Sequence, residues 1–353
     1  MAAAPSAPKP KATSCSLPLS PPRKVHILIT GASSGLGRGF FEHYSSFPPT
    51  THYVRGIDAR PYPTHPGTSS CTVGASGHFY QLDLSAEALV QKYVRSATLA
   101  PSSKPHASRA ASPIISYRPP QRSLTSERLP PTSSSTPSHV TWPAPNSGTA
   151  TPRSAATADD SSPPHYTGPF DLVIHSAGIR GLVPAHESQH PADIAGAESI
   201  AVMDGATMRR AFEINCVATF ALIKALLPSL RASAALRRND SHHPPPKVVV
   251  MASRMGSQAS NSGGGAYAYR ASKAALNAVV RSFSIDVPEV AFALVHPGRV
   301  ETGLVRTREE GAVEVGESVG DILELIRRFG EEEGEGGLRS GCFVDRWGNE
   351  IPW

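Results

Sequence analysis

Tyr269 and Lys273 stand four residues apart in a stretch whose pattern predicts a helix, so they share a face one turn apart. A phenol titrates near about 10, too high for acid–base chemistry at neutral pH, but a neighbouring ammonium group favours the phenolate and lowers that pKa. Ser253 lies sixteen residues earlier, directly after an apolar run, where its hydroxyl could hold a substrate oxygen beside the phenol. The Tyr-x-x-x-Lys spacing alone usually marks an exposed pair on a helix. The three residues predict acid–base chemistry only if other elements position them.

The stretch VHILITGASSGLG, residues 25–37, changes abruptly from an apolar run to a loop of small residues. Residues 25–29 predict a buried parallel strand, since a short β-branched run between turn residues suits a strand covered on both faces. Gly31, Gly35 and Gly37 then lead into a helix with an apolar side. Glycines let a backbone approach a pyrophosphate, and a helix N-terminus supplies N–H groups with partial positive charge. A lone glycine loop is as often a structural turn, so a dinucleotide site needs support from the rest of the chain.

A second apolar run, residues 53–57, ends at Asp58, twenty-one residues beyond Gly37. A dinucleotide-binding unit places a carboxylate at about this point, on the adenosine ribose, although a strand-end aspartate can also simply start a turn. The carboxylate would accept hydrogen bonds from both ribose hydroxyls and repel a phosphate on the ribose. Arg38 and Arg60 could instead swing towards such a phosphate. We predict NAD(H) over NADP(H), because the strand end fixes the carboxylate while both arginines have flexible side chains.

The alternation of strands and helices continues along the chain and predicts a single doubly wound α/β domain with a parallel sheet, a Rossmann fold. The remaining predicted strands are residues 78–84, 170–174 and 247–251, and further helices are predicted at 86–94, 204–230 and around Tyr269. The strands at 78–84 and 170–174 are expected to be neighbours. Asp83 and Leu84, at the end of the third strand, are candidate adenine contacts, with a helix cap as the alternative role of Asp83.

The helix predicted over residues 204–230 carries apolar residues at spacings of three and four, which predicts a stripe facing the core. These residues are Met208, Phe212, Cys216, Phe220 and Ile223. Asn215 lies inside the same helix, where a polar amide is at best neutral. A polar stretch with three prolines, residues 235–246, is expected to end the helix in a loop.

The composition separates a compact part of the 353-residue chain from segments that cannot fold alone. Residues 101–168 hold 36 Ser, Thr or Pro in 68 positions, which buries too little apolar surface to offset chain entropy. We predict a disordered tail at 1–22 and one domain over 23–353, interrupted by a disordered insert at about 95–168.

The net charge is +5, but the residues before the first strand carry +4 and residues 101–160 carry +3, which leaves −2 for the rest. The basic charge therefore predicts no nucleic-acid partner.

Four scattered cysteines, without Cys-x-x-Cys or metal-ligand spacing, predict a reduced, cytoplasmic chain without a metal site. No apolar run approaches the roughly 20 residues that span a bilayer, so no membrane partner is expected. The start of the chain lacks acidic residues before Glu42, a faint likeness to a transit peptide, but its prolines argue against the amphipathic helix that such a peptide needs.

The conjunction of the glycine loop with Ser253, Tyr269 and Lys273 resembles the short-chain dehydrogenase/reductase family, and within it the sniffer-like or C-factor-like carbonyl reductases. The segments that carry this likeness are TGASSGLG, MASRMGSQ, the glycine-bearing gap at 261–265, YAYRASKAALN, HPGRVET and the closing GNEIPW. The likeness covers nearly the whole chain outside residues 1–22, 95–168 and 235–246.

This resemblance implies an NAD(P)-dependent oxidoreductase that transfers hydride between a nicotinamide and a ketone, aldehyde or secondary alcohol. It implies that Tyr269 is the general acid or base and that Lys273 binds the nicotinamide ribose and lowers the pKa of Tyr269. Ser253 would orient the carbonyl oxygen, and Asn215 would hold a water in a proton relay. The predicted cofactor-binding residues are Thr30, Gly31, Ser33, Ser34, Gly35, Leu36, Gly37, Asp58, Asp83, Leu84, Ser176, Ala177, Gly178, Tyr269, Lys273, Pro297, Gly298, Val300 and Thr302.

One position departs from the family pattern. Where Asn-Asn-Ala-Gly is common in the family, this chain has His175-Ser176-Ala177-Gly178. The Ala-Gly turn is kept, and we interpret His175 as a structural hydrogen-bonding substitute rather than a new catalytic base.

The alternative function is a regulatory protein that senses nicotinamide nucleotides and carries interaction or phosphorylation sites on its insert; the intact Ser253, Tyr269 and Lys273 weigh against it. Substrate specificity is expected in residues 179–203, 254–265 and 303–315, with a mobile lid after Thr302. In many relatives, helices that correspond to residues 205–230 and 266–286 pair between subunits. We therefore expect a homodimer or homotetramer that acts on a small carbonyl or alcohol substrate.

Overall fold

The computed structural model describes residues 23–68, 70–98, 169–239, 244–305, 307–330 and 338–353. The described residues on either side of the long gap belong to one compact unit. The predicted disorder of residues 1–22 falls outside the described residues, as does that of the insert predicted at about 95–168 from residue 99 onward. Residues 95–98 are described and are helical, so the predicted insert begins too early. Residues 240–243 of the polar loop also lie outside the described residues.

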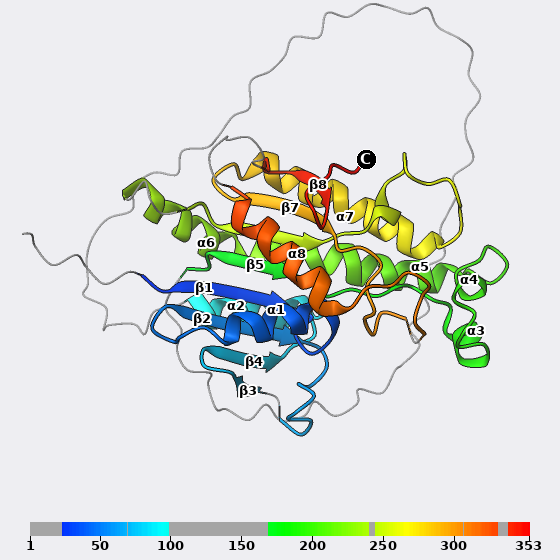
Figure 1. The fold of residues 1–353 in the computed structure, drawn as a ribbon, viewed down its shortest axis with the longest axis horizontal. Helices are drawn as coiled ribbons and strands as arrows, with labels where there is room; N and C mark the ends of the chain where they lie inside the picture. The colour runs from blue at the N-terminus through cyan, green and yellow to red at the C-terminus, as the bar shows by residue number, and fades with distance from the viewer. Residues whose placement is uncertain (1–22, 69, 99–168, 240–243, 306, 331–337) are drawn as a thin grey trace, which may run out of the picture. The chain divides into compact units, whose positions relative to one another are not determined.

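An eight-stranded sheet forms the middle layer of the domain (Figure 1). Its strands are β1 (Val25–Thr30), β2 (His52–Asp58), β3 (Ser70–Val73), β4 (Gly77–Gln81), β5 (Leu172–His175), β6 (Lys247–Met251), β7 (Ala291–His296) and β8 (Cys342–Asp345). Their order is β3-β4-β2-β1-β5-β6-β7-β8, and every pair is parallel except β3 with β4. The predicted doubly wound α/β fold is confirmed.

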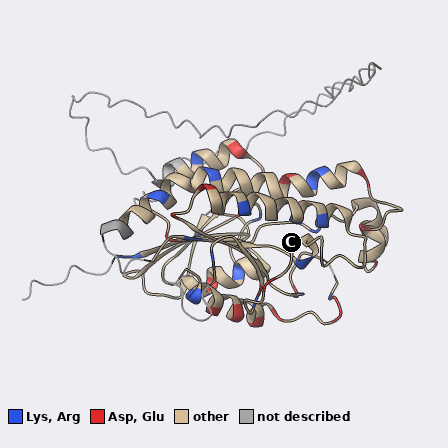
Figure 2. Ribbon diagram, turned by 90° about the horizontal axis from the view of Figure 1, so that it is seen from above, with Lys and Arg blue, Asp and Glu red and all other residues tan. Residues whose placement is uncertain are grey.

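Helices cover both faces of the sheet, with α6 and α7 on one face and α1 and α8 on the other (Figures 1 and 2). The helices are α1 (Gly35–Ser45), α2 (Glu87–Thr98), α3 (Pro184–Gln189), α4 (Ile194–Ala197), α5 (Gly205–Phe212), the π-helical turn η1 (Glu213–Val217), α6 (Ala218–Asn239), the 3₁₀ turn η2 (Arg254–Gly256), α7 (Tyr267–Asp286) and α8 (Val315–Arg328). Charged residues gather on the helices and loops, while the middle layer is mostly uncharged (Figure 2).

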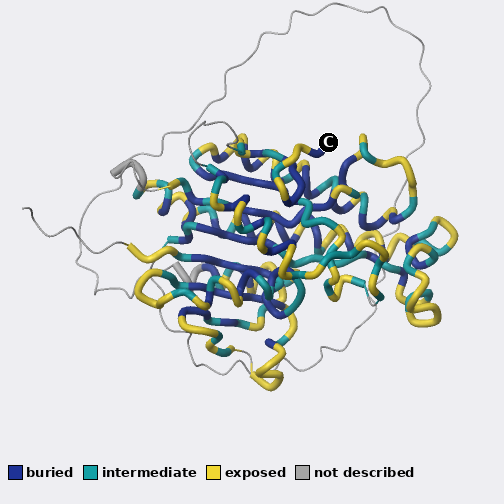
Figure 3. Tube along the Cα trace, viewed as in Figure 1, coloured by how far each residue is buried: buried dark blue, intermediate teal, exposed yellow. Residues whose placement is uncertain are grey.

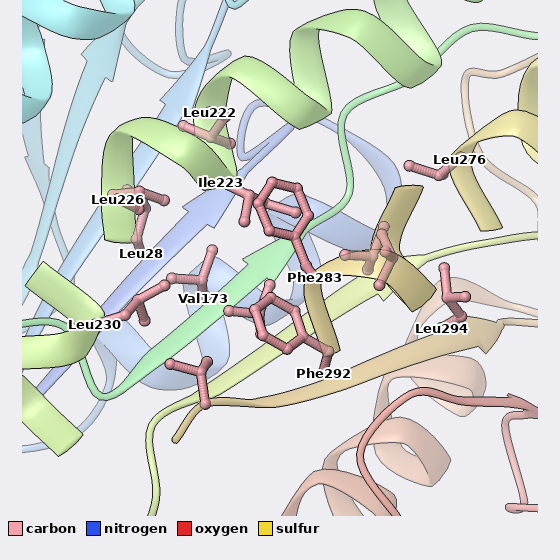
Figure 4. Packing of buried hydrophobic residues seen from close by; sticks show 14 of the residues in the cluster. Leu28, Val173, Leu222, Ile223, Leu226, Leu230, Leu276, Phe283, Phe292 and Leu294 are labelled. Atoms are coloured by element: carbon pink, nitrogen blue, oxygen red, sulfur yellow. The ribbon is translucent and has the colours of Figure 1, made fainter. Parts of the chain in front are cut away.

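Two apolar cores lie on the two faces of the sheet, as strands buried on both sides require. One core packs α6 and α7 on the sheet, with Leu226, Phe283 and Phe292 among its buried residues (Figure 4). The other packs α1 and α8, with Phe40 and Ile322 fully buried. The central strands are accordingly the most deeply buried part of the trace (Figure 3), and they hold the loops at their carboxyl ends in fixed positions.

The strand neighbours differ from the prediction at one point. The third and fourth predicted strands correspond to β4 and β5, and these are separated by β2 and β1. The strand β5 pairs with β1 on the side away from β2. The strand order therefore reverses at β1. At such a switch point the loops after two neighbouring strands diverge and leave a crevice.

The long helix also differs from the prediction. Of the predicted core stripe, Cys216 and Ile223 are buried, but Met208, Phe212 and Phe220 are 39%, 45% and 43% exposed. The π-helical turn η1 inserts a residue into the turn around Asn215 and shifts the phase of the helix, so spacing measured through it does not follow one face. The helix also continues to Asn239, which makes residues 235–239 helical rather than part of a loop.

The expectation that no apolar run approaches membrane length needs a correction for the same helix. The stretch Gly205–Leu236 contains an 18-residue window that is long and apolar enough to cross a bilayer, although half of that window is buried in the fold. It packs on α2 and α7, as a core helix does. The three cysteines among the described residues, Cys71, Cys216 and Cys342, are free thiols.

Candidate functional site

A cavity of about 750 Å³ lies at the carboxyl ends of the strands, at the switch point beside β1. Its wall combines the loop after β1, the ends of β2 and β4, the loop after β5, part of α5 and η1, the end of β6, one face of α7 and the segment after β7. The predicted residues that line it are Gly31, Ser34, Gly35, Leu36, Asp58, Asp83, Leu84, Ser176, Ala177, Gly178, Tyr269, Lys273, Pro297 and Thr302.

Backbone packing explains the glycines of the loop after β1. Gly31 has φ +68°, and a Cβ there would lie 3.0 Å from the backbone nitrogen of Ala177. A Cβ on Gly37 would lie 2.3 Å from the carbonyl oxygen of Gly31, too close for any side chain. The loop after β1 therefore packs directly on the loop after β5 and on the first turn of α1, which keeps the floor of the cavity flat.

The N-terminus of α1 opens into this cavity and suits an anion. Ser34 occupies the N-cap position but its side chain makes no capping hydrogen bond to the helix, and the first turn contains no acidic residue. The Ser34 hydroxyl instead accepts a hydrogen bond from the guanidinium of Arg60. Uncapped N–H groups, the helix dipole and a nearby guanidinium together fit a phosphate group.

Asp58 closes β2 and is held in place by the glycine loop. Its Oδ2 accepts hydrogen bonds from the backbone N (3.1 Å) and Oγ (2.7 Å) of Ser33, and its Oδ1 accepts one from the backbone N of Arg60 (3.0 Å). The residue is 9% exposed and lines the cavity. Arg38, the other arginine considered from the sequence, pairs with Glu42 on α1 at 2.7 Å and does not line the cavity.

Asp83 lines the cavity, and its adenine contact stays a prediction. Its Oδ1 accepts hydrogen bonds from the backbone N (2.9 Å) and Oγ (2.8 Å) of Ser85, two residues before α2, and not from an N–H group of the helix that it was expected to cap. Thr302 lies over the glycine loop from the segment after β7, since a Cβ on Gly35 would meet its side chain at 3.0 Å.

A chain of hydrogen bonds runs under the cavity floor through His175. The hydroxyl oxygen of Thr30 accepts hydrogen bonds from the backbone N–H groups of Ser176 and Ala177, so its proton points at Nδ1 of His175, 2.9 Å away. Nε2 then carries the proton and donates to Thr219 Oγ1 at 2.8 Å, which in turn donates to the carbonyl oxygen of Asn215 at 3.0 Å. Burial lowers the pKa of His175 to about 3, in accord with this neutral form.

Asn215 is fixed by three further hydrogen bonds. Its Oδ1 accepts from the backbone N of Ile179 (2.8 Å), and its Nδ2 donates to the carbonyl oxygen of Ile179 (2.9 Å) and to Ser272 Oγ (3.0 Å). Its side chain thus ties η1 to the loop after β5 and to α7. The network from Thr30 to Asn215 supports the interpretation of His175 as a structural hydrogen-bonding residue.

Tyr269 and Lys273 share the buried face of α7, as their spacing predicted. Lys273 Nζ lies 5.8 Å from the centre of the Tyr269 ring and donates to the carbonyl oxygen of Met251 at the end of β6 (2.9 Å). The hydroxyl of Ser253, two residues further along the chain, accepts from the backbone N of Met255 at 3.2 Å and is close enough to the Tyr269 phenol to lower its pKa. The structure brings the three side chains together, with Tyr269 and Lys273 in the cavity lining and Ser253 buried beside them.

The electrostatics of Tyr269 differ from the expectation. Burial raises the pKa of the phenol, and the groups that oppose this rise are Arg180, followed by the hydrogen bond from Ser253. Burial also lowers the pKa of Lys273 to about 8, which weakens it as a permanent cation. Desolvation therefore acts against both charged forms, and the lowering of the Tyr269 pKa by Lys273 stays a prediction.

Arg180 lies in the segment 179–203 that was expected to set specificity, but its contact with Tyr269 was not predicted. It lines the cavity and its guanidinium carbon lies 5.0 Å from the centre of the Tyr269 ring. It follows the Ala177-Gly178 turn by two residues, at the carboxyl end of a predicted strand, which is the available signal. Its partner Glu198 is eighteen residues further along the chain, and no spacing rule connects the two.

The other predicted residues are not part of the cavity lining; besides Gly37, Asn215 and Ser253, they are Thr30, Ser33, Gly298 and Val300. Thr30 and Ser33 make the hydrogen bonds described above, Gly298 adopts φ +90°, and Val300 bridges to Val313. Of the segments expected to set specificity, residues 179–180 and 303–304 reach the cavity lining, whereas 254–265 do not.

A doubly wound sheet with a glycine loop at its switch point defines a nucleotide-binding α/β protein, and comparison with known proteins narrows this class. The family model described as short chain dehydrogenase matches residues 158–312. The C-signal protein of Myxococcus xanthus is 38% identical over 189 residues, which cover 53% of this chain and 95% of the relative. A 1-hydroxy-2-glutathionyl-2-methyl-3-butene dehydrogenase of Rhodococcus sp. (strain AD45) is 34% identical over 139 residues, 39% of this chain and 50% of the relative.

Solved structures share the fold at low sequence identity. The carbonyl reductase Sniffer of D. melanogaster aligns with a TM-score of 0.57 and 20% identity over 94% of this chain and all of that chain. The NADPH-bound carbonyl reductase from chicken fatty liver gives the same values. The chain belongs to the short-chain dehydrogenase/reductase family, a family of oxidoreductases.

Proposed function

We propose that this protein is a nicotinamide-dependent carbonyl reductase and secondary-alcohol dehydrogenase in which Tyr269 gives and takes the proton. The observation that carries the proposal is that Tyr269 and Lys273 line one end of a cavity whose other end is the glycine loop, with Ser253 close enough to lower the pKa of the Tyr269 phenol. A proton donor beside a crevice that fits a dinucleotide is the arrangement that this activity needs.

The residues of the cavity fit a dinucleotide. The uncapped N-terminus of α1 would hold the pyrophosphate, and Asp58 would hold the adenosine ribose. The turn Ser176–Gly178 would contact the cofactor beside the adenosine ribose. A Cβ on Gly178 would lie 3.0 Å from Asn215 Oδ1 and 3.7 Å from Lys273 Nζ, so the absence of a side chain keeps the path to Lys273 open. The bound nicotinamide would supply or accept the hydride.

The protein groups handle the proton. During ketone reduction, the Ser253 hydroxyl would hold the carbonyl oxygen while the Tyr269 phenol donates its proton to that oxygen. During alcohol oxidation, the Tyr269 phenolate would take the hydroxyl proton. Lys273 would bind the nicotinamide ribose, and its charge would favour the phenolate to the extent that it stays protonated. Asn215, held through Ile179, would keep η1 in register with α7 and hold a water for proton relay.

We propose NAD(H) as the preferred cofactor. Asp58 supports this proposal, because its carboxylate is held at the strand end by Ser33 and would repel a phosphate on the ribose. Arg60 acts in the other direction, since its guanidinium already reaches Ser34 beside the cavity.

Dissociation constants of NADH and NADPH for the wild type, Asp58→Ala and Arg60→Ala separate these two effects. We expect tighter NADH binding in the wild type, a gain of NADPH affinity in Asp58→Ala, and a loss of NADPH affinity alone in Arg60→Ala. Tighter NADPH binding by the wild type that Asp58→Ala leaves unchanged contradicts the proposal.

The activity itself is tested by oxidation of NADH and NADPH in the presence of a panel of ketones and aldehydes. We expect turnover of at least one carbonyl class, with Lys273→Met as an inactive control. Tight nucleotide binding without turnover of any carbonyl or alcohol would favour the regulatory alternative instead.

We also propose that the protein is a homodimer or homotetramer through the face formed by α5, η1, α6 and α7. The exposed apolar residues Met208, Phe212, Phe220 and Ile285 support this, because an apolar face of this kind is costly to leave in water. Sedimentation of the wild type and of Phe212→Ser tests it: a wild-type monomer would contradict the proposal, and a variant that dissociates would support it.

A further inference from the structure

Arg180 and Tyr269 form a stacked pair at the end of the cavity away from the glycine loop. The guanidinium carbon of Arg180 lies 5.0 Å from the centre of the Tyr269 ring, within the range of a cation–π contact. The Arg180 side chain is 12% exposed, so water screens its charge little. A guanidinium also keeps its proton at every pH at which an enzyme works.

Glu198 holds Arg180 in this position. Nε of Arg180 donates to Oε2 of Glu198 at 2.8 Å and Nη2 donates to Oε1 at 2.9 Å, a bidentate pair with fixed geometry. The backbone carbonyl of Glu198 also accepts a hydrogen bond from the backbone N of Ala266, the N-cap residue of α7. The pair is therefore tied to the start of the helix that carries Tyr269.

The backbone beside Arg180 packs closely on the same helix. Gly181 has φ +78°, and a Cβ there would lie 3.0 Å from the Cβ of Ala268, the residue before Tyr269. Because no side chain separates the two segments, the distance from Arg180 to the Tyr269 ring depends on backbone contacts as well as on the Glu198 pair.

We propose that Arg180, held by Glu198, is a positioning residue that keeps a permanent positive charge against Tyr269 and favours its phenolate form for proton abstraction. The proposal rests on the proposed function of Tyr269 and deepens it: Lys273 contributes its charge only while it is protonated, whereas Arg180 contributes at all pH values.

Charged groups from several elements face Tyr269, and they act in different directions. Lys273 approaches from α7 and Arg180 from the loop after β5, while Glu198 and Glu309 come from the segments after α4 and after β7. The two carboxylates raise the pKa of the phenol and Arg180 lowers it. Glu198 thus both positions Arg180 and offsets part of its charge. In Glu198→Gln the amide oxygen still accepts one hydrogen bond from Arg180, so this variant lowers the pKa of the phenol, whereas Arg180→Gln raises it.

The test is an ultraviolet difference titration of the phenol in protein without added nucleotide, with Tyr269→Phe as the reference spectrum. We expect Arg180→Gln to raise the Tyr269 midpoint by roughly 1 pH unit and Glu198→Gln to lower it, as expected for the loss of one opposite or one like charge at this distance. Arg180→Lys keeps the charge and should lie nearer the wild type. Arg327→Gln, which removes one partner of an exposed bidentate pair on α8, is the matched control and should leave the midpoint unchanged.

The same variants are then compared in pH profiles of kcat/KM for alcohol oxidation. The proposal is supported if Arg180→Gln and Glu198→Gln shift the midpoint in opposite directions, both in the titration and in the pH profiles. Opposite shifts in titration without activity in any variant sustain the role of Arg180 while contradicting the proposed function. Equal midpoints in all variants, shifts of the same sign for Arg180→Gln and Glu198→Gln, or a midpoint in Arg180→Lys as high as in Arg180→Gln would overturn the proposal.

Discussion

The two ends of the cavity are built in different ways. The glycine-loop end depends on backbone geometry: Gly31 and Gly37 are required because main-chain atoms of Ala177 and Gly31 occupy the space of a Cβ. The other end depends on side chains from separate segments, where Arg180 stacks on Tyr269 and Glu198 holds it. One end tolerates almost no change of residue type, while the other can be altered charge by charge without moving the backbone.

This difference indicates a division of labour. A rigid, backbone-lined end suits a ligand common to a whole family, because backbone groups offer the same hydrogen bonds in every member. A side-chain-lined end suits chemistry that varies between members. The predictions below test whether the two ends can be disturbed separately.

The largest effect at the glycine-loop end is expected for Gly37→Ala. The added methyl group would meet the carbonyl oxygen of Gly31 and push the loop open, and such overpacking costs roughly 1–3 kcal/mol. We expect nucleotide affinity to fall by roughly 10-fold or more, measured by fluorescence titration with NADH.

Gly320→Ala is the matched control for this substitution. Gly320 is exposed within α8 and has no atom within 4 Å of the added position. We expect nucleotide binding to be unchanged and stability to rise by up to about 1 kcal/mol, from helix propensity alone. Equal losses of affinity in the two variants would mean that the loop contact is not the cause.

His175→Ala should disturb both ends to a smaller extent, since His175 joins Thr30 under the glycine loop to Thr219 and Asn215. The variant removes one hydrogen-bond partner from each of two buried hydroxyl groups, those of Thr30 and Thr219, which costs roughly 1–3 kcal/mol of unfolding free energy. Urea unfolding measures this loss. Thr219→Val removes only one side of the chain and should cost less; a larger loss in Thr219→Val would contradict the role of His175 as the link between the two sides.

The smallest effect is a dependence of stability on mildly acidic pH. Burial lowers the pKa of His175 to about 3 and those of His26 and His296 to about 4, below the 6.5 of an unfolded chain. The unfolded chain therefore binds more protons than the fold between these values, and stability is full above about pH 6.5 and falls as the pH drops towards 4. Urea unfolding at pH 7 and pH 5 should show this loss, with a shallower slope in His175→Asn. If His175→Asn leaves the pH dependence of stability unchanged, protonation of His175 does not cause the loss.

The sequence was sufficient for the parts of the molecule that depend on local rules. The glycine loop, the strand end at Asp58 and the shared face of Tyr269 and Lys273 all follow from residue type and short spacing, and each lies where it was expected. The doubly wound fold follows from the alternation of strands and helices.

Other features depend on contacts that spacing does not encode. The edge strands β3 and β8 each pair with a single neighbour, β4 and β7, at the two ends of the sheet. The position of β5 beside β1 follows from a crossover. The exposed side of the long helix was mistaken for core because η1 breaks the periodicity around Asn215. Arg180 and Glu198 meet only in the folded chain, and burial, which no motif reports, reverses the expected direction of the Tyr269 pKa.

The central claim is that Tyr269 transfers the proton in a site whose nucleotide end works independently, and Tyr269→Phe tests it most directly. The variant keeps the ring and its stacking against Arg180 but removes the hydroxyl. With the best carbonyl substrate, we expect kcat to fall by ~10²-fold or more, as for the loss of general acid–base help, while the dissociation constant of NADH stays within about twofold of the wild type. A variant that reduces the substrate at the wild-type rate would contradict the account.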